Sequence, residues 1–276
     1  MTVEREFEFR QEDFRFIASL VLAKTGIVLA DHKEDMVYAR IARRLRSLNL
    51  RNFREYCSLL ELQESEEIGN FVNAVTTNLT SFYREGYHFE HLRDEVLVPH
   101  VAGKPESKRL RIWSSACSSG AEPYSIALCC LEAIPDIARW DVKILATDID
   151  TKMLAKAKAG LYSADEVEPI PAALRKKYTS VDKASGMVQM ADKVRELITF
   201  KPLNLIEPWP FKGPFDVIFC RNVVIYFNKD TQRQLFNSMA ERMRLGGWLY
   251  IGHSETLHGI CDRYELRDKT TYQRVA

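Results

Sequence analysis

The sequence predicts an α/β protein in which a mostly parallel sheet carries helices on both faces and follows a small all-helical domain. From Leu110 onward, apolar runs of strand length alternate with helical patterns, which is typical of a parallel sheet. Residues from about 8 to 78 show helical spacing only. In about 160–202 the alternation breaks, and we expect an inserted β-subdomain. A long irregular crossover is the alternative for this segment.

The helical domain is expected to span residues 1–80. Its first apolar pattern runs to Gly26, which is a typical helix stop. A second apolar stripe follows, and two shorter helices are expected at 53–62 and 68–75. The residues of the second stripe are Val37, Ile41, Leu45 and Leu48.

The second domain is expected to span residues 81–276, and the bridging segment 78–101 should contain a helix. The Gly246-Gly247 pair should end the last helix of this domain. The tail contains two short β-like runs that fit a closing antiparallel hairpin. Strands are expected at 109–115, 142–147, 197–201, 215–221, 247–252, 264–266 and 271–275, with helices at 122–134, 151–158 and 230–244.

Composition bounds the class of protein. The chain has 276 residues, of which 46% are hydrophobic and 28% charged, as expected for a well-packed soluble protein. A formal net charge of +1 argues against a non-specific nucleic-acid binder. No apolar run reaches transmembrane length, and residues 1–10 lack the core of a signal peptide. We therefore expect a cytoplasmic protein without direct membrane insertion.

Metal sites and disulfides are not expected. The six cysteines form no Cys-x-x-Cys pair and lie mostly in apolar surroundings, which favours reduced core cysteines. His88 and His91 lie three residues apart on a helical stretch. No nearby pattern of carboxylates and histidines completes a metal site, so we interpret both as structural or surface residues.

A candidate ligand turn lies between 110 and 125, where a strand leads through small residues into a helix. A second strand then ends in Asp148, and an acidic residue at that edge of an open α/β sheet commonly holds ribose hydroxyls. Gly120 is the turn's single glycine, whereas pyrophosphate turns carry three, and Glu122 would repel a phosphate. These features favour a nucleoside with a cationic or amino-acid tail, with S-adenosylmethionine as the candidate. An ordinary buried turn is the alternative.

Five ordered segments, with the terminal hairpin, resemble the chemotaxis-receptor glutamate methyltransferases, the CheR family of class I S-adenosylmethionine-dependent enzymes with a Rossmann-like sheet. The resemblance covers essentially the whole chain. Ala121 departs from the family, which usually has a glutamate there, but the following Glu122 is retained. The five segments are Asn78–Glu85, Trp113–Ser125, Ala146–Asp150, Cys220–Phe227 and Gly252–Glu255.

The resemblance implies a set of cofactor contacts. Asp148 would accept from the ribose hydroxyls, Glu122 would offset positive charge, and Arg84 would meet a carboxylate. Helix capping is the alternative for Asn78 and Thr80; Asp150 is better placed than Asp148 to cap the helix near residue 151. The implied cofactor residues are Asn78, Thr80, Arg84, Glu122, Asp148, Asn204, Leu205, Asn222 and Val223.

The implied reaction is methyl transfer to a glutamate side chain. A free glutamate has a pKa of about 4.3 and is already ionised near neutral pH, so the reaction needs no general base. The enzyme would align the reactants and exclude water. We expect Arg84 and Tyr226 to be the positioning residues, although Tyr226 is also compatible with a core aromatic.

An arginine-rich segment, 36–54, contains no acidic residue. A solvated helix face is the ordinary explanation. The resemblance implies an acidic partner instead, the cytoplasmic helical bundle of methyl-accepting chemotaxis receptors. The arginines expected to dock it are Arg40, Arg43, Arg44 and Arg46.

Some members of the family grip a receptor-tethering pentapeptide with a longer, glycine-bearing loop. The segment 183–190 is short here, and we predict that no tether is needed. A nucleic-acid amino methyltransferase is the enzyme alternative, but residues 222–225 lack the prolines of many such enzymes. A receptor-binding module with weak catalysis is the other alternative, and only Ala121 favours it.

Overall fold

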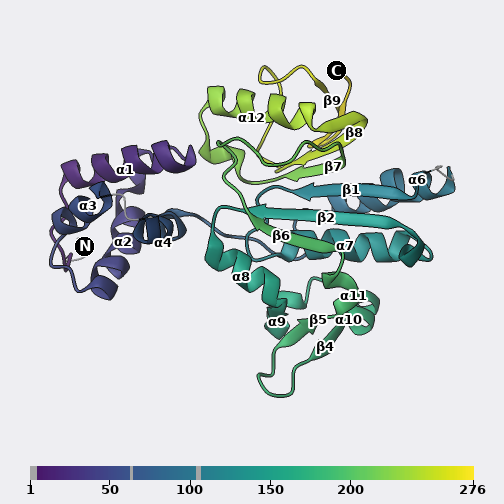
Figure 1. Ribbon diagram of the computed structural model, residues 1–276, viewed down its shortest axis with the longest axis horizontal. Helices are drawn as coiled ribbons and strands as arrows, with labels where there is room; N and C mark the ends of the chain where they lie inside the picture. The colour runs from purple at the N-terminus through teal and green to yellow at the C-terminus, as the bar shows by residue number, and fades with distance from the viewer. Residues whose placement is uncertain (1–4, 63–64, 104–106) are drawn as a thin grey trace.

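The computed structural model describes residues 5–62, 65–103 and 107–276. Residues 1–4 and 63–64 of the expected first domain and 104–106 of the expected second domain lie outside the described residues. The N-terminal helices form a separate lobe beside the sheet (Figure 1), and their apolar stripes meet in one core that contains Phe14, Val37, Ile41 and Leu45. The helices are α1 (Gln11–Thr25), α2 (Glu34–Leu48), α3 (Phe53–Glu61) and α4 (Ser65–Val75), with a short 3-10 turn η1 (Asp31–Lys33) before α2.

The main sheet has seven strands in the order β6-β2-β1-β7-β8-β10-β9. The first five run parallel, and β10 and β9 close the sheet as the expected antiparallel hairpin. The chain leaves β1 toward β2 on one side and returns to β7 on the other. The strands are β1 (Arg109–Ser114), β2 (Asp141–Asp148), β6 (Ile198–Pro202), β7 (Phe215–Cys220), β8 (Met243–Ile251), β9 (Tyr264–Asp268) and β10 (Thr271–Arg274).

Helices cover both faces of this sheet (Figure 1), because successive strand residues point to opposite sides. Val217 and Phe219 of β7 face the core under α7 and α8, whereas Ile218 and Cys220 face the core under α12. The helices are α5 (Tyr87–His91), the π-helical η2 (Leu92–Leu97), α6 (Val98–Ala102), α7 (Ala121–Ala133), α8 (Thr151–Ala159) and α12 (Lys229–Glu241), with 3-10 turns η3 (Ile137–Arg139) and η4 (Val224–Tyr226).

A small β-subdomain hangs below the sheet in Figure 1, between α8 and β6. Its three antiparallel strands follow the order β3-β5-β4. The inserted β-subdomain expected in about 160–202 is therefore present, with β5 as its central strand. The elements are β3 (Leu161–Tyr162), α9 (Ala164–Val167), α10 (Ala172–Tyr178), β4 (Thr179–Val181), β5 (Val188–Met190) and α11 (Asp192–Arg195).

The predicted fold class is confirmed, but the expected boundary between the last helix and the strand that follows it was wrong. The helix expected at 230–244 ends at Glu241, and Gly246 and Gly247 lie inside β8 instead of ending a helix. Pairing of Met243 with Phe215 draws this segment into the sheet, and the Met243 side chain is buried there. Tertiary packing thus overrides the local helical pattern.

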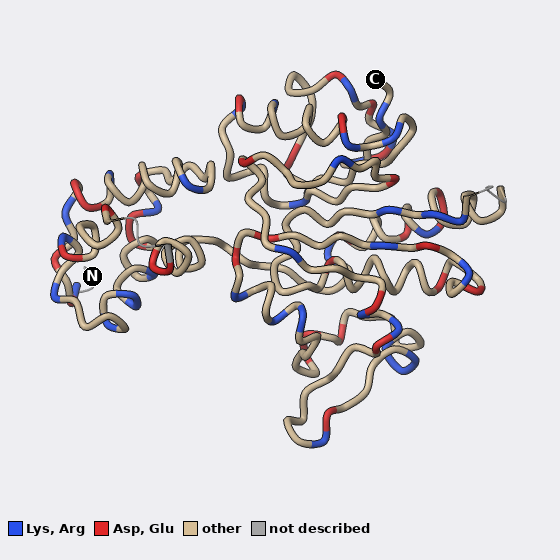
Figure 2. The backbone as a smooth tube through the Cα atoms, in the orientation of Figure 1, with Lys and Arg blue, Asp and Glu red and all other residues tan. Residues whose placement is uncertain are grey.

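The two lobes are joined beside the carboxyl edge of the sheet. Ile27, just after α1, forms an isolated antiparallel bridge with Phe227, and the Val28 N–H donates to the Tyr226 carbonyl at 2.8 Å. Acidic and basic residues are interspersed over both lobes (Figure 2), in keeping with the small net charge. Within the described ranges, no helix is both long and apolar enough to cross a membrane.

Candidate active site

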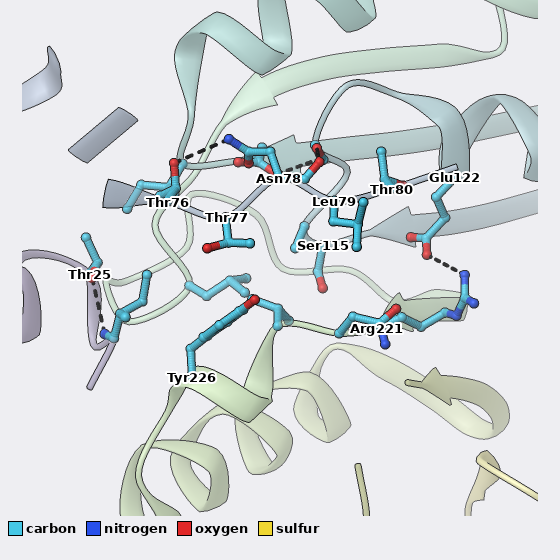
Figure 3. A pocket seen from close by; sticks show the side chains of 18 of the residues that line it. Thr25, Thr76, Thr77, Asn78, Leu79, Thr80, Ser115, Glu122, Arg221 and Tyr226 are labelled. Carbon is cyan, nitrogen blue, oxygen red and sulfur yellow. Dashed lines mark hydrogen bonds and ion pairs between the residues drawn. The ribbon is translucent and has the colours of Figure 1, made fainter. Parts of the chain in front are cut away.

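A pocket opens where the chain crosses from one half of the parallel sheet to the other. Its walls come from the segments that follow β1, β2, β6 and β7, with further residues from the loop after α4 and from the end of α1 (Figure 3). This is the edge at which open α/β sheets bind ligands. The space is about 870 Å³, part of it open to solvent. All ten residues predicted as cofactor-binding or positioning line it: Asn78, Thr80, Arg84, Glu122, Asp148, Asn204, Leu205, Asn222, Val223 and Tyr226.

The turn after β1 is held closely against its neighbours. Gly120 has φ +92°, and a Cβ there would lie 2.8 Å from the Ala157 side chain and 2.9 Å from the Tyr162 hydroxyl. The glycine is therefore required by its left-handed backbone and by close packing against α8 and β3. Ala121, the departure from the family pattern, is buried in the core at the start of α7.

Asp148 ends β2 as a buried carboxylate at the pocket wall. Its Oδ2 accepts from the Ser118 N–H at 2.7 Å, and its Oδ1 accepts from the Asp150 N–H at 2.8 Å. Burial raises the pKa of Asp148 to about 6, although these N–H donors act in the opposite direction. A ligand that donates hydroxyls to this carboxylate would stabilise its ionised form.

Asp150 caps α8, as the sequence indicated. Its Oδ1 accepts from the backbone N–H groups of Lys152 and Met153, while its Oδ2 accepts from the Asn78 side chain at 2.7 Å. The Asn78 carbonyl accepts in turn from the Ser118 hydroxyl at 3.0 Å. These contacts fix the segment after α4 against the β1 turn, so Asn78 shapes the pocket through its protein partners.

Glu122 lies at the start of α7 and is paired within the protein. Its Oε1 accepts from the Ser114 hydroxyl at 2.7 Å, and its Oε2 forms an ion pair with Arg221 at 2.9 Å (Figure 3). The Arg221 side chain is only 2% exposed. Arg221, which directly follows β7, therefore already supplies part of the positive charge that Glu122 was expected to offset.

Arg84 and Tyr226 reach the pocket from two different segments of its rim, the loop before α5 and the turn η4. The Arg84 guanidinium donates to the Leu79 carbonyl at 2.8 Å, which leaves further N–H groups of the side chain for a ligand. Thr80 lies on the same loop as Leu79 and Arg84 and also lines the pocket. Tyr226 extends from η4 toward the Thr77 side of the pocket (Figure 3). Leu79 is 79% exposed at this rim.

Asn204 forms a hydrogen bond between the two lobes. Its side-chain amide donates to the Lys24 carbonyl at 2.7 Å and to Glu207 at 2.9 Å, and its Oδ1 accepts from the Ile206 N–H at 3.3 Å. A cofactor contact of the Asn204 amide, which the family resemblance implies, would compete with these bonds. Leu205 provides apolar surface next to it.

Asn222 adopts a left-handed backbone conformation, with φ 57°. Glu255, from the loop after β8, accepts from the backbone N–H groups of Asn222 and Gly252 at 3.1 and 2.5 Å. It also accepts from Val224 and Ile225 at 3.0 and 3.3 Å. Burial raises the pKa of Glu255, which these N–H donors oppose. Four donors to one carboxylate hold the Asn222-Val223 segment in place.

Sequence reasoning did not single out several residues of this site. Arg221 and Glu255 lay inside the quoted motifs, and a charged residue directly after the apolar run that ends a strand was a usable signal for Arg221. Thr25 and Ile27 also line the pocket, although they belong to the helical lobe. No local sequence pattern predicts that these two residues line the pocket, because their position depends on how the lobes pack.

The four arginines of α2 differ in their surroundings. Arg40 donates to the carbonyls of Val75 and Thr76 at 2.5 and 2.8 Å. Arg44 forms an ion pair with the buried Glu67. Arg46 pairs with Glu6 near the surface at 2.6 Å, and Arg43 is exposed. Arg40 and Arg44 therefore stabilise the lobe itself, whereas Arg43 and Arg46 face solvent.

The pocket fits an adenosine-bearing cation better than a phosphate. Asp148 supplies a buried acceptor at the end of β2, and Glu122 adds a second carboxylate near the start of α7. The same space is lined by Ile149, Leu203 and Leu205, which offer apolar surface to a flat ring. The fold and this site define a class I S-adenosylmethionine-dependent methyltransferase, with S-adenosylmethionine as its cofactor.

Family models and curated relatives make the assignment more specific. Residues 12–76 match the CheR methyltransferase all-alpha domain, and residues 78–273 match the CheR methyltransferase SAM binding domain. The chain therefore belongs to the CheR methyltransferase family. It is 46% identical to a probable chemotaxis protein methyltransferase of Rhizobium etli, covering 87% of this chain and 91% of that protein. It is 40% identical to the chemotaxis protein methyltransferase of Escherichia coli, covering 94% and 89%.

Proposed function

We propose that the protein transfers a methyl group to glutamate side-chain carboxylates of methyl-accepting chemotaxis receptors, giving glutamyl methyl esters. The observation that carries this proposal is the meeting of Asp148 and Glu122 with Arg84 and Tyr226 in one pocket of a CheR-family chain. The carboxylates suit the cofactor. Arg84 suits an anionic acceptor at the rim.

The proposed reaction requires the protein to align the reactants, but it does not require a general base. Bound S-adenosylmethionine supplies an electrophilic methyl group on a positively charged sulfur. A glutamate acceptor is already ionised near neutral pH. Arg84 would orient this carboxylate, and Tyr226 would restrict the direction from which the carboxylate approaches the methyl group. Because opposite charges disappear during transfer, a pocket that excludes water favours the transition state over separated ions.

Product chemistry tests this proposal directly. Receptor-enriched membranes incubated with tritiated S-adenosylmethionine and the protein should acquire label that mild base releases as methanol. An ester behaves in this way, whereas a methylated nitrogen retains the label. Base-stable label, or label in added DNA or RNA, would contradict the glutamate assignment.

We also propose that receptor recognition does not require a tethering pentapeptide. The β4–β5 connection is a tight turn: the Asp182 N–H donates to the Met187 carbonyl at 2.7 Å, and the Gly186 N–H donates to the Asp182 carbonyl at 2.8 Å. This supports a loop too short to enclose a peptide. Calorimetric titration with a receptor C-terminal pentapeptide should show no heat of binding, and saturable binding would refute the proposal.

A further inference from the structure

Glu85 joins three segments behind the wall of the pocket. Its side chain is 10% exposed and belongs to the loop before α5. Oε1 accepts from the Asn222 side chain at 3.2 Å and lies 2.9 Å from His253 Nδ1. Oε2 accepts from the His253 backbone N–H at 3.1 Å and lies 3.3 Å from Arg221 Nη2. One carboxylate thus links this loop to the segments after β7 and β8.

The linked positions are conformationally strained. Glu85 and Asn222 both have φ 57°, and Tyr83 has φ 52°. Left-handed backbone is unfavourable for a residue with a side chain, because Cβ comes too close to the following carbonyl oxygen, although asparagine tolerates it better than glutamate or tyrosine. Such conformations persist where surrounding contacts fix them. The contact between the Glu85 and Asn222 side chains ties two of these positions together, so it stabilises the shape of the pocket wall.

The same carboxylate shares the buried Arg221 with Glu122. Arg221 lies 2.9 Å from Glu122 and also donates to the Arg84 carbonyl. Burial would raise the pKa of Glu85, but His253, Arg221 and Asn222 outweigh it and lower the pKa to about 2. Glu85 is therefore ionised throughout the physiological range. Its charge helps to keep Arg221 beside Glu122 at the edge of the pocket.

We infer that Glu85 is a positioning residue, whose carboxylate holds Asn222 and Arg221 in the geometry that accepts the amino-acid end of the methyl donor. This inference rests on the proposed cofactor roles of Asn222 and of Glu122, the residue with which Arg221 forms its ion pair. Glu85 acts through them and from behind the wall. A glutamine cannot replace it, because an amide offers one acceptor oxygen and would place an N–H group against donors of Asn222, Arg221 or His253.

The test compares Glu85→Gln with wild type by calorimetry with S-adenosylhomocysteine and by methyl-transfer kinetics. We expect Kd for S-adenosylhomocysteine and KM for S-adenosylmethionine to rise about tenfold or more, with KM for receptor unchanged. Glu90→Gln is the matched control, because Glu90 is exposed on the neighbouring α5 and should leave both constants unchanged. His253→Ala removes one partner and should raise Kd less, about twofold to threefold.

Several outcomes would overturn the inference. Wild-type cofactor affinity in Glu85→Gln is one, and an equal rise of both KM values with a lower melting temperature is another, since it indicates a general structural role. If Glu85→Gln does not fold, His253→Ala decides, and wild-type affinity in that variant would refute the role of this cluster. Lack of S-adenosylhomocysteine binding by the wild-type protein would instead refute the pocket assignment itself.

Discussion

Asp148 combines burial with an expected ligand role, and this combination has a consequence for pH. Its pKa of about 6 describes the ligand-free protein. Ribose hydroxyls donate to the ionised carboxylate, so the cofactor should bind the deprotonated form preferentially. Below pH 6 the carboxyl must lose a proton on binding. We expect Kd for S-adenosylhomocysteine to rise toward tenfold per pH unit below 6, and Asp148→Asn to bind more weakly and without this pH dependence.

Calorimetry between pH 5 and 8 measures this effect, and buffers of different ionisation enthalpy report the released proton. Asp216→Asn is a suitable control, since Asp216 pairs with Arg244 at the opposite end of β7 at 2.8 Å. Its affinity profile should follow that of the wild-type protein. A flat wild-type profile from pH 5 to 7 would contradict the ribose contact at Asp148.

The raised pKa of Asp148 also affects stability. Between about pH 4 and 6 the folded protein holds a proton that the unfolded chain releases, so the free energy of unfolding falls as pH rises. Because the pKa rises from the ordinary aspartate value of 3.8 to about 6, the loss is about 3 kcal/mol. Asp148→Asn should remove it. We expect the ligand-free variant to be more stable than wild type at pH 7.5, but not at pH 4, in urea denaturation.

At the scale of elements, the arginines of α2 fall into two groups, those that contact the helical lobe and those that are exposed. Arg43 and Arg46 face solvent, and Arg46 has only an exposed partner, Glu6. Reversal of both to glutamate should repel an acidic receptor bundle and raise the apparent KM for receptor about tenfold, with unchanged S-adenosylhomocysteine affinity. Arg233→Glu on α12 of the sheet domain is the control. Receptor kinetics equal to those of wild type would exclude docking by α2.

The elements of the sheet were predictable because each has a strong local signal. β1, β2 and β7 contain short apolar runs, β6 begins with apolar and polar residues in alternation, and the tail hairpin shows its two β-like segments. The start of β8 was not predictable in this way. Residues 243–244 continue the helical pattern of α12, and their pairing with β7 is a long-range contact that local sequence does not encode.

The residues of the pocket were also predictable only in part. Motifs at the ends of strands located Asp148, Glu122 and Asn222, since the topology brings these ends together. The partners of those residues were less accessible. That Glu122 pairs with Arg221, or that Asn204 binds the Lys24 carbonyl across 180 positions, follows from side-chain packing and leaves no periodic signal.

At the scale of the molecule, the helical lobe forms part of the cofactor pocket. Thr25 and Ile27 line the cavity, and the turn between them, Gly26, lies against the segment after β6. A Cβ on Gly26 would lie 2.7 Å from Ile206 Cγ2 and 3.5 Å from the Phe227 ring. The end of α1 therefore fits closely between the segments that follow β6 and β7. We expect the lobes to act as one unit in binding the cofactor.

Gly26→Ala tests this coupling from outside the pocket lining. The new methyl group should push the end of α1 away from Ile206, displace Thr25 and Ile27, and raise Kd for S-adenosylhomocysteine about threefold to tenfold. Gly186→Ala is a matched control, because φ is +70° there and +74° at Gly26, but open space surrounds Gly186. Both variants carry the backbone cost of a left-handed alanine, roughly 1 kcal/mol, and only Gly26→Ala adds the steric contact. Calorimetry of the two variants separates these effects: equal affinities would mean that the helical lobe can shift without changing the pocket.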